Sequence, residues 1–451
     1  MLVLLVRPDR PDVESERKRV GLRHQPLGLL YLATAAHGAG FDVEIVDEVL
    51  GENAERRIEQ LRPDWVGITV ASRLFRRSCE IARFAKARGA RVVLGGPHPT
   101  ALPEHSLVES GADVVVIGEG EQTFVELLTT CQWDRVRGLC FNRDGRVVKT
   151  ESRPPIEDLD RLPIPNRQLL RLQRYRSDSE LGHYVPRGDR LIRLMATRGC
   201  PYRCTFCAGH AVFGRRVRFR STESVVEEIR QCVADFDAHH FSFIDDTLTV
   251  QPDYATELCE RLIRSRLRVR WSCLSRVGLD DRMLGLMRRA GCVMLGFGIE
   301  SGSRTVLEWI RKEIDPAVAM DTIRRARRHG LVTKTFWIVG LPKEGEREYR
   351  ESLLLAKRLG SDFAIPSVFL PLPGSEEFDR MQRAGLETDP NRIISVSSDE
   401  GESRRRQRRF LREFYLRPAY LYSVLRHLCG ASIRQHLALL WAFLKEGAGP
   451  G

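Results

Sequence analysis

Short apolar runs alternate with helical patterns over most of the 451-residue chain, and this alternation is the strongest constraint on its fold. In residues 1–135 the runs are nearly all apolar, as expected for parallel strands that are buried on both faces. Helical periodicity separates them, for example in Ser78–Ala87. The pattern predicts a doubly wound α/β domain. Its five expected strands are Leu2–Val6, Val43–Val46, Trp65–Val70, Arg91–Leu94 and Asp113–Ile117.

Three loops at the carboxyl ends of these strands favour a ligand-binding face, because ligands of such sheets bind beyond those ends. Glycine lets backbone amides approach a bulky ligand closely. A tight turn explains any one such loop equally well, but three loops on one edge favour a ligand. The loops are Val70-Ala-Ser72-Arg, Gly95-Gly96-Pro-His98-Pro-Thr100 and Gly118-Glu119-Gly120-Glu-Gln-Thr123.

A second series of strands and helices occupies residues 189–385. Six βα units predict a partial (β/α)6 TIM-type barrel, with its active site at the carboxyl ends of the strands. The expected strands are Leu191–Ala196, His240–Ile244, Val269–Leu274, Val293–Ile299, Thr333–Val339 and Phe363–Phe369.

Residues 136–188 read as a connector between the two series. A small hairpin is expected to turn at Asp144-Gly145. An extended, proline-stiffened stretch begins at Pro154 and would hold the two domains at a restricted separation.

Three cysteines, Cys200, Cys204 and Cys207, follow the first barrel strand at C-x3-C-x2-C spacing. An iron–sulfur cube normally takes four cysteine ligands. Three clustered ligands without an obvious fourth suggest a cluster with one iron open to a small molecule. The chain shows no signal-peptide pattern, so we expect a cytoplasmic protein, where unpaired cysteines favour metal or redox chemistry.

The run Cys200-x3-Cys204-x-Phe206-Cys207 resembles the signature of radical S-adenosylmethionine (SAM) enzymes. Motifs at the other strand ends extend the resemblance over the whole barrel. It implies that the three cysteines bind a [4Fe–4S] cluster and that SAM chelates the open iron. An electron from an external flavodoxin- or ferredoxin-type donor then cleaves SAM to methionine and a 5′-deoxyadenosyl radical.

The same resemblance implies SAM contacts for four residues. Asp245 and Asp246 lie where the motif for the SAM amino group falls, Glu300 is placed to accept bonds from the ribose hydroxyls, and Phe206 would pack beside the adenine. Each aspartate is explained equally well by a cap or turn, and Glu300 has a structural ion pair as its alternative. Arg276 is a candidate partner for a carboxylate or a substrate anion, with a surface salt bridge as the alternative.

Residues 1–135 resemble the cobalamin-binding domain that precedes many radical SAM barrels, through Gln25-Pro-Leu-Gly28-Leu-Leu-Tyr31 and the glycine loops. The domain lacks the Asp-x-His-x-x-Gly motif, so we expect cobalamin with no histidine on its lower face. His24 and His98 are alternative cobalt ligands, although a loop or packing role suits each better. The implied cobalamin contacts are Gly28, Ser72, Gly95, Gly96, His98, Gly118, Glu119 and Gly120.

Residues 386–451 form a basic, helical C-terminal extension, and the chain carries a net charge of +12. Its segment Phe410-Leu-Arg-Glu-Phe-Tyr-Leu-Arg-Pro resembles the bacteriochlorophyll-cyclase and hopanoid-type branch of these enzymes. The arginine run and the apolar stretch Leu437–Leu444 predict either peripheral membrane contact or a helix docked on the barrel. No run of 18 apolar residues predicts a membrane span.

These patterns favour a cobalamin-dependent radical SAM enzyme that methylates an unactivated carbon of a small-molecule or lipid metabolite. A radical cyclase or rearrangement enzyme of the same family is the first alternative. A non-catalytic cobalamin or redox sensor is a second alternative, and an RNA-modifying enzyme is a third. No nucleic-acid partner is expected, because no RNA-binding module is apparent.

Overall fold

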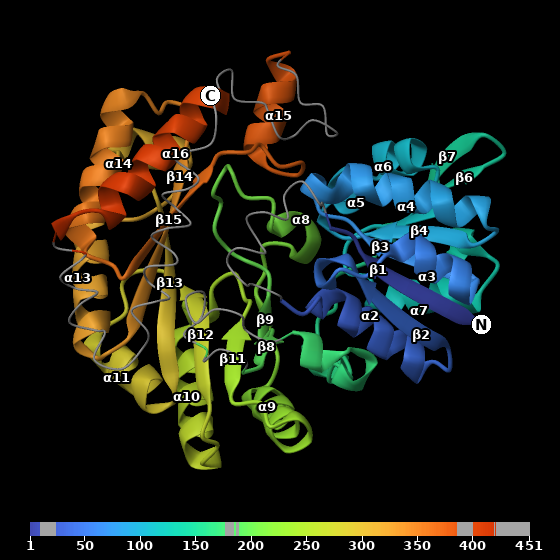
Figure 1. The fold of residues 1–451 in the computed structure, drawn as a ribbon, viewed down its shortest axis with the longest axis horizontal. Helices are drawn as coiled ribbons and strands as arrows, with labels where there is room; N and C mark the ends of the chain where they lie inside the picture. Colours follow the sequence, from blue (N-terminus) through green and yellow to red (C-terminus); the bar gives the residue numbers. More distant parts are fainter. Residues whose placement is uncertain (10–23, 176–184, 186–188, 386–399, 419, 421–451) are drawn as a thin grey trace.

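The computed structural model describes residues 1–9, 24–175, 185, 189–385, 400–418 and 420. Two α/β halves lie side by side, and the strands of the first half run from the N-terminus toward the second half (Figure 1). The carboxyl ends of the first sheet therefore face the barrel.

The first half is a seven-stranded sheet in the order β2-β1-β3-β4-β5-β6-β7, with helices on both faces. Its first five strands are parallel, which confirms the predicted doubly wound domain. The elements are β1 (Leu2–Arg7), α2 (Leu27–Gly38), β2 (Asp42–Asp47), α3 (Ala54–Leu61), β3 (Trp65–Thr69), α4 (Phe75–Ala87), β4 (Arg91–Gly95), α5 (Pro97–Ala101), α6 (Pro103–Ser110), β5 (Val114–Val116), α7 (Glu121–Thr129), β6 (Leu139–Arg143) and β7 (Arg146–Lys149).

The predicted hairpin forms, but it extends the first sheet instead of standing apart in the connector. Asp144 and Gly145 both have positive φ, as a two-residue primed turn requires. β6 pairs antiparallel with β5 through Val114 opposite Phe141. Because β5 would otherwise be an open edge, the hairpin covers it.

The second half is a six-stranded parallel sheet in the order β15-β14-β13-β12-β11-β8, which confirms the partial barrel. Its elements are β8 (Leu191–Leu194), β9 (Thr197–Arg198), α8 (His210–Phe213), β10 (Arg218–Phe219), α9 (Thr222–Phe236), β11 (His240–Phe243), α10 (Pro252–Ser265), β12 (Arg270–Ser275), α11 (Asp281–Arg289), β13 (Cys292–Glu300), α12 (Arg304–Trp309), α13 (Pro316–Arg328), β14 (Val332–Val339), α14 (Glu346–Leu359), β15 (Phe363–Val368), α15 (Glu376–Arg383) and α16 (Glu400–Tyr415). Short 3-10 helices lie at Glu48–Leu50, Ser72–Leu74, Trp133–Arg135, Leu159–Arg161, Arg167–Leu169, Leu172–Arg174 and Leu248–Val250.

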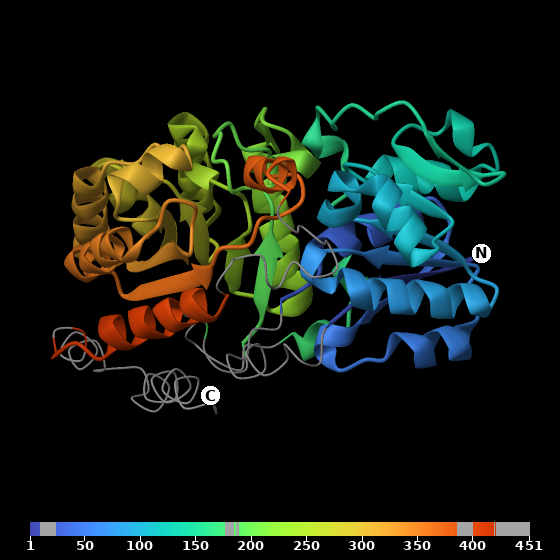
Figure 2. The same ribbon diagram turned by 90° about the horizontal axis from the view of Figure 1, so that it is seen from above.

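Helix α16 packs along the outer side of β14 and β15 (Figure 2). Phe410 is buried against Trp337, with ring centroids 5.6 Å apart. The Tyr415 hydroxyl bonds both backbone groups of Ala364, at 3.1 and 2.9 Å. This part of the tail is thus a helix docked on the barrel, whereas Leu437–Leu444 lies outside the described residues. In the described part of the chain, no helix has the length and apolarity needed to cross a bilayer.

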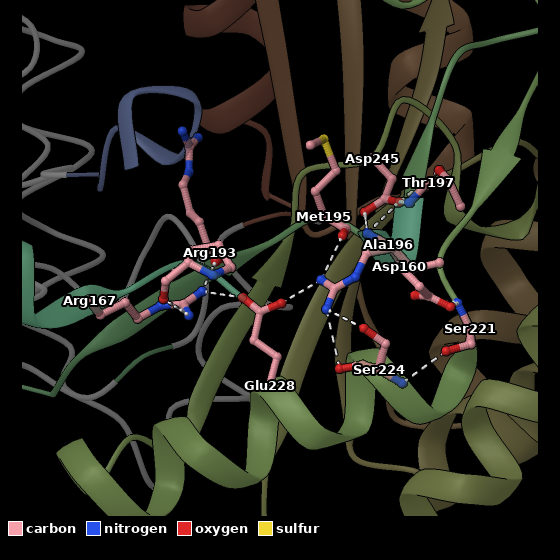
Figure 3. A network of polar contacts seen from close by, with 12 residues as sticks. Asp160, Arg167, Arg193, Met195, Ala196, Thr197, Ser221, Ser224, Glu228 and Asp245 are labelled. Atoms are coloured by element: carbon pink, nitrogen blue, oxygen red, sulfur yellow. Dashed lines mark hydrogen bonds and ion pairs between the residues drawn. The ribbon is translucent and has the colours of Figure 1, made fainter. Parts of the chain in front are cut away.

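A first set of buried ion pairs fixes the connector to the barrel (Figure 3). Glu228 on α9 is fully buried and accepts from Arg167 of the connector at 2.5 Å and from Arg220. Arg167 also donates to the carbonyl of Arg193 on β8 at 2.9 Å. Two strongly paired cations around one carboxylate therefore anchor the connector to the first barrel strand.

A second set joins the first sheet directly to the start of the barrel. Arg198 on β9 pairs with Glu119 at 3.2 Å and with Glu121 at 2.5 Å, and Arg218 also pairs with Glu119. Gln25, fully buried, donates to the carbonyl of Leu191 at 3.1 Å. These contacts set the position of the first domain's ligand edge relative to the cysteine loop.

Adjacent glutamates on α9 provide a matched test of the connector anchor. Glu228→Gln should lower the free energy of unfolding by about 3 kcal/mol, because it leaves two buried guanidinium groups without their counter-charge. Glu227→Gln removes only an exposed pair with Arg230 and should cost less than about 1 kcal/mol. Denaturant unfolding measures both, and equal losses would contradict the anchoring role of Glu228.

Candidate functional site

The cysteine loop leaves the barrel at the carboxyl end of β8 and is held in place at its start by close backbone packing. Gly199 has φ +94°, and a Cβ there would overlap the carbonyl oxygen of Arg216. Only glycine fits this position. The next residue, Cys200, donates its backbone N–H to the carbonyl of Gly214 at 3.3 Å.

The middle of the loop is fixed by Thr205, which lies between the second and third cysteines. Its N–H donates to the carbonyl of Ile310 at 3.0 Å, and its hydroxyl donates to buried Glu377 at 2.7 Å. Phe206 turns into an apolar cluster with Val306 and Phe369 at the mouth of the barrel. The mouth therefore holds an apolar wall beside the thiols, in agreement with an adenine-packing position for Phe206.

The three thiols are half-buried and form no disulfide. Burial raises the pKa of Cys200, Cys204 and Cys207, so cationic iron rather than the protein would hold them as thiolates. The Gly209 N–H lies 3.4 Å from the Cys207 sulfur as a donor to it. Within the described ranges no three His, Cys, Asp or Glu side chains are grouped closely enough for a single ion. This spacing suits a cluster, in which each cysteine binds a different iron.

The two adjacent aspartates after β11 have different roles. Asp245 is fully enclosed and accepts from the Ala196 N–H at 3.0 Å and the Thr197 hydroxyl at 2.7 Å. Desolvation raises the pKa of Asp245 to about 6. Asp245 therefore ties β11 to the strand that leads into the cysteine loop, and its predicted SAM contact is not supported.

Asp246 points the other way, into the open face. Its carboxylate is exposed and lies close to Gly209, next to the thiol of Cys207. Partial burial raises the pKa of Asp246. Among the described residues the structure records no hydrogen bond or ion pair to this carboxylate. Of the two aspartates, only Asp246 is available to an ammonium group.

Glu300 ends β13 in a left-handed conformation, with φ +67°, at a register shift between β13 and β14. This backbone is costly for a residue with a Cβ and is typical of functional positions. Its carboxylate is already paired with Lys312 at 3.1 Å, and both side chains are about nine-tenths buried. Glu300 thus combines the predicted position at the mouth with the ion pair that was the alternative.

Arg276 and Lys312 place positive charge beside the cluster loop. The Arg276 guanidinium lies 3.7 Å from the ring centroid of Tyr202, between the first two cysteines, and donates to the carbonyl of Glu313. Both cations act to lower the pKa of the Cys204 thiol against its burial. Sequence reasoning missed Lys312, since no motif surrounds it.

The cobalamin loops lie where predicted, at the carboxyl edge of the first sheet. Gly96 has φ +108°, and a Cβ there would lie 3.0 Å from the Val70 carbonyl oxygen. Gly28 and Gly118 border open space, which leaves room for a large ligand. The same edge reaches the barrel mouth, because Gly374 after β15 packs against both Ala101 of α5 and Ala211 of α8. Gly95 and Gly120 lie at the end of β4 and at the start of α7.

Two predicted cobalamin contacts have other partners in the structure. Both Glu119 oxygens bind arginines of the barrel, and one also accepts from the Ile156 N–H at 3.1 Å. Glu119 is thus part of the domain joint. His98 is buried, bonds Ser72 at 3.0 Å and stacks on Phe75. Desolvation lowers the pKa of His98 to about 4, so it is a neutral packing residue.

Sequence comparison decides the family. Residues 194–356 match the Radical SAM superfamily, and residues 17–128 match the B12 binding domain. Over 387 residues the chain is 34% identical to an uncharacterized methyltransferase of Pyrococcus horikoshii, which covers 83% of this chain and 82% of that protein. The chain belongs to the cobalamin-binding radical SAM family. It is a radical SAM enzyme, so the non-catalytic sensor hypothesis is set aside.

Two further relatives define the branch and the fold. The chain is 30% identical to the anaerobic magnesium-protoporphyrin IX monomethyl ester cyclase of Rubrivivax gelatinosus, over 82% of this chain and 69% of the cyclase. The radical SAM methyltransferase TsrM of Kitasatospora setae, solved with cobalamin and a [4Fe–4S] cluster bound, superposes with a TM-score of 0.69 at 22% identity. That match covers 86% of this chain and 76% of TsrM and confirms the two-domain fold.

The adjacent aspartates allow a matched test of the SAM site. Asp246→Asn should weaken SAM binding to the cluster-loaded enzyme about tenfold, because one charge-assisted bond is lost, and should leave the melting temperature unchanged. Asp245→Asn should lower stability by about 1–3 kcal/mol, since it breaks a buried set of bonds. Calorimetric titration with SAM and thermal melts measure both variants. The assignment is wrong if Asp246→Asn binds SAM normally.

A second matched pair tests the cluster ligands. Cys204→Ala should abolish the iron–sulfur absorbance and the iron content of anaerobically reconstituted protein, while the first domain still binds cobalamin. Cys131→Ala removes an exposed cysteine far from the loop and should leave both signals intact. A normal cluster spectrum in Cys204→Ala would show that this thiol is not a ligand.

Proposed function

We propose that this enzyme methylates an unactivated carbon of a small-molecule or lipid metabolite. The observation that carries the proposal is the arrangement of two sites on one joint. The ligand edge of the first domain faces the cysteine loop, and Arg198, two residues before Cys200, binds Glu119 and Glu121 of that edge. A methyl donor on one side and a radical initiator on the other need this kind of fixed geometry.

In this proposal Cys200, Cys204 and Cys207 hold the [4Fe–4S] cluster. SAM lies against Asp246, Glu300 and Phe206, and cobalamin lies on the loops that contain Gly28, Ser72, Gly95, Gly96, Gly118 and Gly120. When bound, the cluster supplies the electron that cleaves SAM, and cobalamin supplies the methyl group.

The chain's own residues orient these ligands and exclude water. Asp246 offers a carboxylate to the SAM ammonium group, and partial desolvation strengthens that pairing. Lys312 holds the Glu300 carboxylate in one orientation at 3.1 Å. Phe206 and its apolar neighbours keep water from the mouth, where a carbon radical would otherwise be lost to side reactions.

Electron supply and location follow the same reasoning. We infer an external flavodoxin- or ferredoxin-type donor and a cytoplasmic enzyme, because an open cluster loop needs a reducing compartment. Membrane contact through the C-terminal tail stays a prediction, since α16 is docked on the barrel.

A radical cyclase is the second candidate, and the 30% identity to the Rubrivivax cyclase favours it. The two reactions differ in the fate of the SAM methyl group. A cyclase would form 5′-deoxyadenosine without adding carbon to its substrate.

Isotope transfer separates the two candidates. The enzyme, loaded with cluster and cobalamin, is incubated without oxygen with methyl-deuterated SAM, a strong reductant and metabolite extract. Mass spectrometry should find an extract component that has gained the deuterated methyl group, together with 5′-deoxyadenosine. Cys204→Ala is the control and should give neither. Formation of 5′-deoxyadenosine without any labelled product would overturn methylation and favour the cyclase.

A further inference from the structure

The barrel strands have two faces of different character. On β13, Leu295, Phe297 and Ile299 pack in the main core against the surrounding helices. Because side chains alternate along a strand, Gly296 and Gly298 face the inside of the barrel. The register of the parallel strands places Leu274, Lys334 and Phe336 on that inner face as well.

The inner face is open beneath the cluster loop. Leu274 keeps 38% of its surface exposed although it lies inside the barrel, and Ser367 on β15 is also exposed. A Cβ at Gly296 would lie 2.7 Å from Leu274 and 3.0 Å from Phe336. These two glycines therefore let apolar side chains from the flanking strands line the lumen.

The lining changes in chemistry from the mouth to the interior. At the mouth, the Glu300–Lys312 pair lies directly over Gly298. One step deeper, Leu274, Phe336 and Ile338 are apolar and partly accessible. The floor is closed by buried Met294.

Lys334 lies at the deep end of this apolar lining. It pairs in register with Gly296, whereas Trp337 pairs with Glu300, so three residues of β14 separate the two levels. At a strand rise of about 3.3 Å per residue this is about 10 Å. Its ammonium nitrogen lies 5.8 Å from the centroid of the Phe336 ring.

Burial leaves the Lys334 charge poorly solvated. Desolvation lowers its pKa to about 8, and a contacting anion would restore part of the lost stabilisation. Lysine is expensive at a position where a leucine or methionine would fill the same space. A cation retained below an apolar lining is typical of recognition of an acid with an apolar body.

We propose that the substrate is an amphipathic acid whose apolar body lies against Leu274, Phe336 and Ile338 and whose anionic group pairs with Lys334. The inference rests on the proposed function, because it takes the reacting carbon to lie at the mouth, between Glu300 and the cysteine loop. A carboxylate, phosphate or phosphonate satisfies the same lysine. Lys334 is then a specificity residue, placed away from the reacting atoms.

A pair of fluorescent probes tests this without knowledge of the substrate. Anilinonaphthalene sulfonate and its neutral parent, phenylnaphthylamine, differ only in the anionic group. Both should bind the full-length, cluster-loaded enzyme saturably. Lys334→Met should weaken the sulfonate about tenfold or more and leave the neutral probe unchanged, because only the charged contact is lost. Lys334→Arg should restore the sulfonate.

Two further variants locate the probe. Lys86→Met removes an exposed lysine of the first domain and should change neither affinity. Leu274→Trp fills the lumen and should abolish binding of both probes, while SAM-independent properties such as the melting temperature and iron content stay near wild type. Equal sulfonate affinity in Lys334→Met and Lys86→Met, binding that survives Leu274→Trp, or no saturable sulfonate binding would each overturn the inference.

The outcome is separable from the fate of the proposed reaction. Probe binding needs neither methyl transfer nor SAM cleavage. Loss of sulfonate binding in Lys334→Met combined with no label transfer in the wild type would leave the acid-binding lumen intact and remove only methylation.

Discussion

Buried charge pairs between the two halves determine everything else about this site. Glu119 and Glu121 of the first domain meet Arg198 and Arg218 of the barrel, and all four side chains are at least nine-tenths buried. A buried ion pair adds little net stability over an apolar contact, but a displaced one leaves an uncompensated charge. The joint therefore specifies one relative position of the halves. Because Arg198 directly precedes the turn into the cysteine loop, that position is also the distance between the two cofactor faces.

Most of the fold could be predicted from the sequence because buried parallel strands leave nearly continuous apolar runs. The cysteine loop could be predicted because its signal is local. The partners of charged residues could not be predicted, since they depend on contacts far along the chain. Glu119 stands among glycines like a ligand-loop residue, yet its arginines lie 79 and 99 residues away. The hairpin was placed in the connector because nothing in its own residues names β5 as a neighbour.

The aspartate pair contained a signal that the motif obscured. Phe241 and Phe243 face the helices, and strand alternation continues that direction to Asp245 and turns Asp246 to the inner side. Burial then decides the roles. Asp245, Glu228 and Glu119 are enclosed and fully engaged, so they hold strands and domains together. Asp246 keeps an accessible carboxylate, which is the condition for meeting a ligand.

The docking of α16 has a consequence for the order in which the molecule is made. Phe410, Phe414 and Tyr415 belong to the same core as β12, β13 and the barrel helices. That core stays incomplete until the ribosome has passed the last of these residues, whereas the seven strands of the first sheet are all synthesised within the first 149 residues. Domains fold as units and the N-terminal unit folds first during synthesis. The nascent chain thus presents a finished cobalamin-type domain before the pocket that receives the cluster has its outer wall.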